Sequence, residues 1–262
     1  MRPLLGQVRS TISLREILDD GKWFIVNISR DRLKESRRLL GSLLVALLHQ
    51  AALSREHVPP DQRIFHAVWV DECAEFWAES FLSVLEGGRK FGLALAILHQ
   101  NLSQPPLGHD PTIVDTILAN THCQIAFNAP RRDAERLSRE LFHATAAETK
   151  YQRHFLGIPI EQPQFWSLGD ERENYVAELM RQQVAEAHVR FKGIGDDEPY
   201  VCRIPHVPDV PINPEKVDVL RRHVARRYYR PVDIVEEEIR QRWASLGLTS
   251  GQAGRVARDF FR

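Results

Sequence analysis

Two adjacent carboxylates follow an apolar run in the first third of the chain. The run extends from Ile64 to Val70, and Asp71 and Glu72 come directly after it. It is too continuously apolar for a half-exposed strand, so it predicts a strand buried on both faces, as in α/β sheets. Open parallel sheets bind ligands at the carboxyl ends of their strands. At such a position one carboxylate can hold a Mg²⁺ shell and its neighbour can orient an attacking water.

A second apolar run, Phe91 to His99, ends in the polar residue Gln100. Two such runs are typical of P-loop ATPases, in which the acids form a Walker B box and the neighbouring strand ends in a residue that senses the γ-phosphate. Gln100 is placed for the sensor role. Two other interpretations stay open: the acids could cap the helix that follows, and Gln100 could be an ordinary loop residue.

Gly88, Arg89 and Lys90 lie between the helix expected after the acids and the second apolar run. Arg89 could reach the nucleotide of an adjacent subunit as an arginine finger, with Lys90 as the alternative for the same role. The two cations could instead favour the helix C-terminus electrostatically.

Composition excludes several classes of protein. Lys plus Arg and Asp plus Glu number 35 each, so any basic surface must be local. The three cysteines have no CxxC spacing, which indicates a reducing cytoplasm and no disulfide framework. There is no apolar run of about 18 residues and no signal-peptide core. His49, His66 and His99 lie in or beside apolar stretches and are interpreted as core or edge residues, not metal ligands.

Strands and helices alternate through residues 1–145. Expected strands cover 23–29, 64–70, 91–99 and 123–130, and expected helices cover 33–53, 73–90, 113–119 and 131–143. Ser13 is a candidate helix cap, and Asp19-Asp20-Gly21 a turn. The alternation predicts an α/β domain with a mainly parallel sheet flanked by helices.

Two smaller regions follow. Residues 146–212 should contain a helix over 170–190, a hairpin around 193–198, and a proline-rich connector. The connector has Pro205, Pro208 and Pro211, and the same spacing continues to Pro214 at the start of the next region. Residues 213–262 should form two helices broken before Pro231, with eleven Lys or Arg against seven Asp or Glu. The local excess of positive charge is concentrated in 221–230, which holds five of the eleven basic residues and no acid. This segment could contact nucleic acid, although a solvated helix face is the favoured interpretation.

Residues 12–142 resemble a known family in the order and spacing of several segments: GKWFIVNIS and the helix LLGSLLVALLHQAALSR, FHAVWVDECAEF, LEGGRKFGLALAILHQNLSQ, and ILANTHCQIAFNAPRRDAERLS. They are similar to the HerA/FtsK superfamily, and most similar to the TraG/TraD/VirD4-like coupling proteins of type IV secretion and conjugation. The resemblance implies a RecA-like ATPase that assembles as a hexameric ring and drives DNA or protein through it using ATP.

The resemblance also implies roles for individual residues. Asp71 would be the Mg²⁺-side acid, Glu72 the water-activating acid, Gln100 the sensor, and Arg89 the residue offered across the subunit interface. ATP and Mg²⁺ would be the cofactors, and DNA the translocated substrate. Secretion-system or membrane proteins would be partners, through which a cytoplasmic protein could lie at the inner membrane.

One departure from the family limits this expectation. The sequence has no GxxxxGK[ST], and Gly21-Lys22 precedes an expected strand instead of a helix. The backbone nest and lysine that cradle phosphates are therefore absent. The chain resembles the C-terminal part of such an ATPase, and we expect little or no ATP hydrolysis by this chain alone. The missing P-loop strand would lie between the strands ending at Gln100 and beginning at Cys123, so its loss should leave a gap or force those strands together.

Three alternatives remain. Another polypeptide could supply the P-loop, which would make this chain one part of a split enzyme. The chain could be a non-enzymatic docking or ring-capping protein of a secretion machine. It could also be an unrelated α/β binding domain whose motifs arose by chance.

Overall fold

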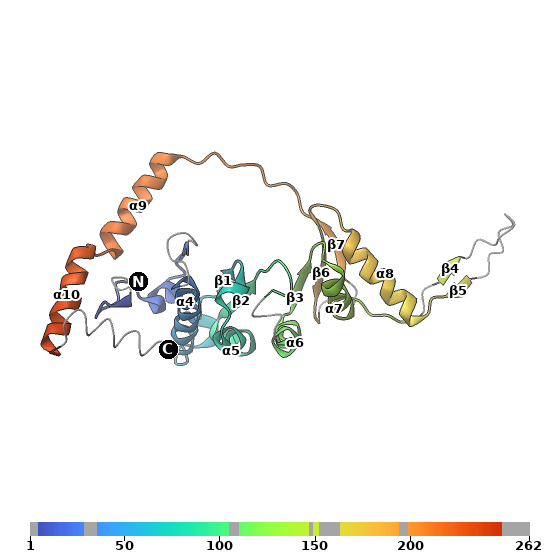
Figure 1. Ribbon diagram of the computed structural model, residues 1–262, viewed down its shortest axis with the longest axis horizontal. Helices are drawn as coiled ribbons and strands as arrows, with labels where there is room; N and C mark the ends of the chain where they lie inside the picture. Colours follow the sequence, from blue (N-terminus) through green and yellow to red (C-terminus); the bar gives the residue numbers. More distant parts are fainter. Residues whose placement is uncertain are drawn as a thin grey trace. The chain divides into compact units, whose positions relative to one another are not determined.

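The computed structural model describes residues 5–28, 36–104, 110–146, 149–151, 163–193 and 199–247 (Figure 1). The chain forms two compact units, one made of Met1–Ser54 with Asp209–Arg262 and the other of Arg55–Pro208. All the predicted site residues lie in the second unit. None of the helices in the described ranges is both long and apolar enough to cross a bilayer.

The first unit is helical. Helix α2 (Leu14–Asp19) begins at Ser13, whose Oγ accepts the Glu16 N–H at 3.2 Å, so the predicted cap is confirmed. Helix α4 (Ser36–Leu53) packs against α2. Helices α9 (Pro214–Tyr228) and α10 (Val232–Ser245) are separated just before Pro231, as expected.

The strand expected over residues 23–29 is not formed. Residues 23–28 have no regular secondary structure, and Ser29 lies outside the described residues. The side chains of Trp23 and Ile25 are 92% and 84% exposed. An apolar run becomes a strand only when a neighbouring strand accepts its backbone hydrogen bonds, and no described strand pairs with this one.

The second unit begins with a parallel pair of strands. Strand β1 (His66–Val70) pairs with β2 (Leu93–Ile97) in a register that matches Val70 with Ile97. Between them lie the short helix η2 (Cys73–Phe76), helix α5 (Glu79–Gly87), which packs on β2, and the short helix η3 (Gly88–Phe91). The single helix expected over 73–90 is broken because Trp77 and Ala78 adopt extended conformations.

Strand β1 is half-buried on one face and exposed on the other, so the expectation of burial on both faces is wrong. Its residues alternate between half-buried and exposed positions, and Trp69 is 73% exposed. Phe65, which precedes the strand on the same alternation, is 65% exposed. An apolar strand is buried on both sides only where other elements pack on each face of its sheet. Among the described residues of the second unit, no element covers the face of Phe65 and Trp69.

The chain continues through helix α6 (Pro111–Asn120) into strand β3 (Cys123–Ala126), which does not join β2. Strand β3 pairs antiparallel with β6 (Glu186–Phe191), which pairs with β7 (Tyr200–Arg203) in the predicted hairpin. The expected α/β fold with a parallel sheet flanked by helices is confirmed, but the parallel part is confined to β1 and β2. Of the two expected consequences of a missing P-loop strand, a gap or a forced pairing, the forced pairing does not occur among the described strands, because β2 and β3 belong to separate sheets.

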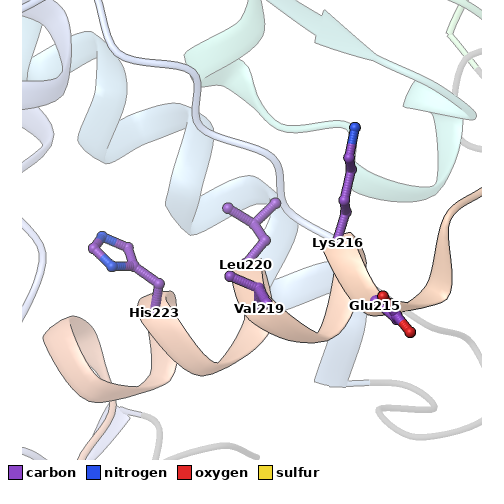
Figure 2. A pocket seen from close by; sticks show the side chains of 5 residues that line it. All are labelled: Glu215, Lys216, Val219, Leu220 and His223. Atoms are coloured by element: carbon purple, nitrogen blue, oxygen red, sulfur yellow. The ribbon is translucent and has the colours of Figure 1, made fainter.

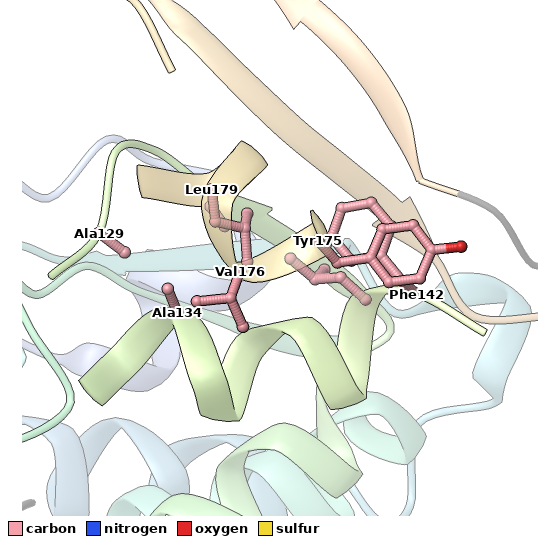
Figure 3. Close-up of a cluster of buried hydrophobic side chains, with 8 residues drawn as sticks. Ala129, Ala134, Phe142, Tyr175, Val176 and Leu179 are labelled. Carbon is pink, nitrogen blue, oxygen red and sulfur yellow. The ribbon is translucent and has the colours of Figure 1, made fainter. Parts of the chain in front are cut away.

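A compact core lies beside the β3–β6–β7 sheet. Helices α7 (Arg131–Leu141) and α8 (Leu168–Arg181) pack against each other (Figure 3). The rings of Phe142 and Tyr175 stack with centroids 4.4 Å apart. The buried residues of the cluster are Ala126, Ala129, Ala134, Leu141, Phe142, Tyr175, Val176 and Leu179. Aromatic stacking adds to the area that these side chains bury.

The region between α7 and β6 differs from expectation in two ways. The helix expected over 170–190 ends at Arg181, because residues 186–191 are drawn into strand β6 by partners on both of its edges. A short ribbon of β4 (Thr149–Tyr151) and β5 (Pro163–Phe165) was not anticipated.

Glu171 of α8 ties the start of this region to the core. Its carboxylate accepts the N–H groups of Thr145 at 3.0 Å and Ala146 at 2.7 Å, and the Tyr175 hydroxyl at 3.0 Å. Burial opposes ionisation of this carboxyl, but the three hydrogen bonds together outweigh burial and lower its pKa.

Candidate functional site

The parallel register places the two predicted polar segments at one edge of the β1–β2 sheet. Two backbone hydrogen bonds continue the ladder beyond the strands: Leu98 N–H donates to the Val70 carbonyl at 2.9 Å, and Cys73 N–H donates to the Leu98 carbonyl at 2.9 Å. These bonds hold residues 71–73 beside the segment that leads to Gln100. The Gln100 Nε2 group donates a hydrogen bond to Glu72 Oε1 at 2.7 Å. The structure therefore joins the expected sensor to the expected water-activating acid.

Glu72 has an unusual backbone. Its φ and ψ are 54° and 43°, in the left-handed region that residues other than glycine seldom adopt. Such conformations are concentrated at functional sites, where the surrounding contacts maintain them. Here the Glu72 N–H donates to Asp71 Oδ1 at 3.0 Å, and the side chain is held by Gln100.

The helix-capping interpretation of the two acids is not supported. The Glu72 side chain accepts no N–H from η2, and the N-cap residue of α5 is Ala78, which provides no side-chain cap. Asp71 accepts only the N–H of its neighbour Glu72 among the described residues. Asp71 is exposed and Glu72 is half-buried. The carboxylates are thus presented at the sheet edge, where they can meet a ligand.

Arg89 and Lys90 lie at the opposite edge of the sheet. They belong to η3, which precedes β2, whereas Gln100 follows β2. The five residues of β2 separate these edges by roughly 16 Å at the usual rise per residue. Both side chains are exposed, and neither forms a hydrogen bond or ion pair with a residue that the structure describes. Arg89 therefore does not reach Glu72 within one chain, and the finger role requires a second subunit.

A buried contact that the sequence did not indicate supports the Gln100 segment. The Leu102 N–H donates to Asp133 Oδ2 at 2.8 Å, and both residues are buried. Asp133 occupies the first turn of α7, where a carboxylate is favoured by the helix dipole. His99 is part of the same segment, and burial lowers its pKa, opposed by a hydrogen bond involving Asn101 and by the charge of Asp133. The one feature of the sequence that could have indicated this contact is the position of Asp133 in the first turn of the helix that follows Pro130.

The residues fit a metal better than they fit a triphosphate. Mg²⁺ is held by one or two carboxylates together with waters and substrate phosphates. Among the described residues, Asp71 Oδ1 accepts the Glu72 N–H and Oδ2 accepts no hydrogen bond. Across the described ranges no group of three or more acidic, histidine or cysteine side chains forms a complete metal site. The sequence also has no phosphate-cradling loop. The edge can therefore supply an acid to a nucleotide whose phosphates are held elsewhere.

Helix α9 carries most of the basic segment 221–230. An open depression on this helix is lined by polar and apolar side chains, which are Glu215, Lys216, Val219, Leu220 and His223 (Figure 2). The two apolar residues, Val219 and Leu220, are exposed. The Arg227 guanidinium lies 5.5 Å from the centroid of the Tyr228 ring. No residue of α9 is buried, in agreement with the favoured interpretation of a solvated helix face.

Comparison with solved structures identifies a similar fold. The plasmid coupling protein TrwB in complex with ADP and Mg²⁺ superposes with a TM-score of 0.53, at 18% identity over 78% of this chain and 45% of that one. TrwB with a non-hydrolysable ATP analogue gives 0.49, at 17% identity over 74% and 43%. The unbound bacterial conjugative coupling protein TrwBdeltaN70 gives 0.46, at 18% identity over 64% and 37%.

The chain spans less than half the length of the coupling-protein chains that it matches. No protein-family model matches the sequence, and no curated protein sequence is similar to it. The expected resemblance to conjugative coupling proteins is confirmed at the level of the fold, through the TrwB complex with ADP and Mg²⁺.

Proposed function

We propose that this chain forms the Walker B and sensor part of a motor ATPase of conjugative DNA transfer or type IV secretion. The observation that carries the proposal is the Gln100–Glu72 hydrogen bond beside Asp71, at the carboxyl edge of two parallel strands. The fold shared with TrwB, which binds ADP and Mg²⁺, supports the same assignment.

The roles of the residues follow from their positions. Asp71, whose Oδ2 accepts no hydrogen bond from a described residue, would take the Mg²⁺ side of the site, where the ion would neutralise phosphate charge. Glu72 would accept the proton of the attacking water, and Gln100 would hold the Glu72 carboxylate in place. Arg89 would act on the site of a neighbouring subunit, in a ring assembled from six copies of the full motor. DNA would be the translocated substrate, and secretion-system proteins would keep the motor at the cytoplasmic side of the inner membrane.

The phosphates need a second source of binding groups. Since this sequence supplies no P-loop, we expect neither tight nucleotide binding nor turnover from the chain alone. A P-loop polypeptide that completes the sheet between β2 and β3 would restore both.

Calorimetry with Mg²⁺-ATP and a phosphate-release assay test this proposal. Each is performed on the chain alone and then with the polypeptide encoded immediately upstream. We expect binding and turnover only in the mixture, with turnover abolished by Glu72→Gln and preserved by the matched substitution Glu79→Gln in the first turn of α5. ATP turnover by the chain alone at the rate of the mixture would refute the proposal that a second polypeptide supplies the phosphate-binding groups.

A docking or ring-capping protein without enzymatic activity is the second candidate. It is favoured by the apolar side chains of Phe65 and Trp69 on the open face of β1, since exposed apolar patches often mark interaction sites. If neither sample binds nucleotide and Glu72→Gln leaves assembly with the secretion machine unchanged, this candidate replaces the ATPase.

A further inference from the structure

The connector between β7 and α9 has a regular proline pattern. Prolines occupy every third position, at Pro205, Pro208, Pro211 and Pro214. A polyproline II helix has three residues per turn, so these four rings would lie along a single ridge. A linker that only needs stiffness requires prolines but does not require this period.

Local sterics dictate the conformation of this segment. Proline fixes its own φ, and the residue before each proline is driven to extended or polyproline II geometry. Between Ile204 and Pro214 only His206, Asp209 and Ile212 escape both restrictions. Asn213, which precedes Pro214, has φ −87° and ψ 107°, as this restriction requires. The segment is extended and has no regular secondary structure (Figure 1).

The segment has no partner in the described part of the chain. The backbone groups of residues 205–212 make no hydrogen bond there, and every one of these residues is exposed. The side chains of Val207, Val210 and Ile212 are 75%, 77% and 79% exposed. A spacer that only separates two regions in water does not require exposed aliphatic side chains that repeat with the same period as its prolines.

The three ridges of such a helix differ in character. Over residues 205–211 one ridge carries the prolines, the next carries Val207 and Val210, and the third carries His206 and Asp209. Beyond this stretch the second ridge continues with Asn213 and the third with Ile212. The pairs Val207–Pro208 and Val210–Pro211 would repeat roughly 9 Å apart, one turn along the helix. Two adjacent apolar ridges therefore form one continuous face, opposite a polar edge.

The charge of the segment restricts the kind of partner. Residues 204–213 contain Asp209 and no lysine or arginine, so they lack the cationic side chains that bind nucleic-acid phosphates or an anionic membrane. Segments with a proline at every third position are recognised by protein grooves lined with aromatic side chains. Such a segment is already extended, so binding orders few additional torsions.

We propose that residues 204–214 are a docking segment that binds, as a polyproline II helix, in an aromatic-lined groove of a partner protein. The face of Val207, Pro208, Val210 and Pro211 makes the contact. This inference does not depend on the ATPase assignment, because it uses none of the site residues.

The test uses the full chain and a panel of purified SH3, WW and EVH1 domains as probes. Binding is followed by calorimetry and by NMR shifts of the aromatic groove residues of each domain. We expect at least one domain to bind, with affinity lowered at least 10-fold by Pro208→Ala combined with Pro211→Ala. Asp209→Asn lies between these prolines on the polar ridge, and we expect it to change the affinity by less than 2-fold.

Two results would overturn the proposal. One is the absence of binding to every domain in the panel, which would leave the segment as a stiff spacer. The other is binding that survives the double proline substitution, which would place the contact elsewhere on the chain. Circular dichroism of each variant verifies that the helical content of the chain is unchanged, so a loss of affinity cannot come from unfolding.

Discussion

Replacing Asp133 should destabilise the second unit and loosen the segment that carries Gln100. The Asp133 carboxylate accepts the buried Leu102 N–H at 2.8 Å, and Asp133 is only 4% exposed. In Asp133→Ala the N–H is left buried without a partner, a loss of about 1–3 kcal/mol. The favourable charge in the first turn of α7 contributes a further ~0.3–1 kcal/mol. Together these terms predict a decrease of roughly 1–4 kcal/mol in the free energy of unfolding.

Two other substitutions separate the contributions. In Asp133→Asn the amide oxygen can still accept the Leu102 N–H, so we expect a loss of about 1 kcal/mol, from the missing charge. Asp115 of α6 is the matched control, since its side chain is 68% exposed and its ion pair with Arg136, at 2.5 Å, lies at the surface. Asp115→Ala should cost less than ~1 kcal/mol.

Urea unfolding measures these differences, and hydrogen exchange locates them. With a slope of about 2 kcal/mol per molar, the midpoint of Asp133→Ala should fall by roughly 1 M. Amide exchange at Leu102 should accelerate in the same variant and stay slow in Asp115→Ala. If Asp133→Ala is no less stable than Asp115→Ala, or if the Leu102 amide stays protected, the buried contact does not support this segment.

Two further predictions concern titratable groups. Burial raises the pKa of the Cys73 thiol to about 12. Iodoacetamide at pH 8 should therefore modify the exposed Cys123 and Cys202 in the native protein and Cys73 only after unfolding. Labelling of all three cysteines in the native state would contradict this. The Glu171 carboxyl has a folded pKa below its ordinary value of 4.5, so its stabilisation is complete above pH 4.5 and is lost as the pH falls through the folded pKa. Melting temperatures between pH 3 and 6 should therefore fall less steeply in Glu171→Gln, and parallel curves would refute the linkage.

Local sequence determined the elements that carry the candidate site. The apolar runs before Asp71 and before Gln100 each formed a strand, and the polar residues lie after those strands because chain direction alone places them there. Ser13 capped its helix, and Pro231 separated α9 from α10, since capping and proline sterics act within a few residues. The extended conformation before Pro214 follows from the same short-range restrictions.

Pairing between distant segments was decided only by the tertiary structure. The Val70–Ile97 register brings Gln100 to Glu72, and a shift of one residue would turn each β2 side chain to the other face. Strand β3 pairs with β6, which lies more than fifty residues further along the chain. Asp133 accepts a hydrogen bond from Leu102, which lies thirty-one residues earlier. Residues 23–28 stayed without a partner, although their apolar pattern resembles that of β1. The physical reason is that hydropathy reports how readily a segment is buried, whereas its neighbours are chosen by hydrogen bonds and packing between segments far apart in the chain.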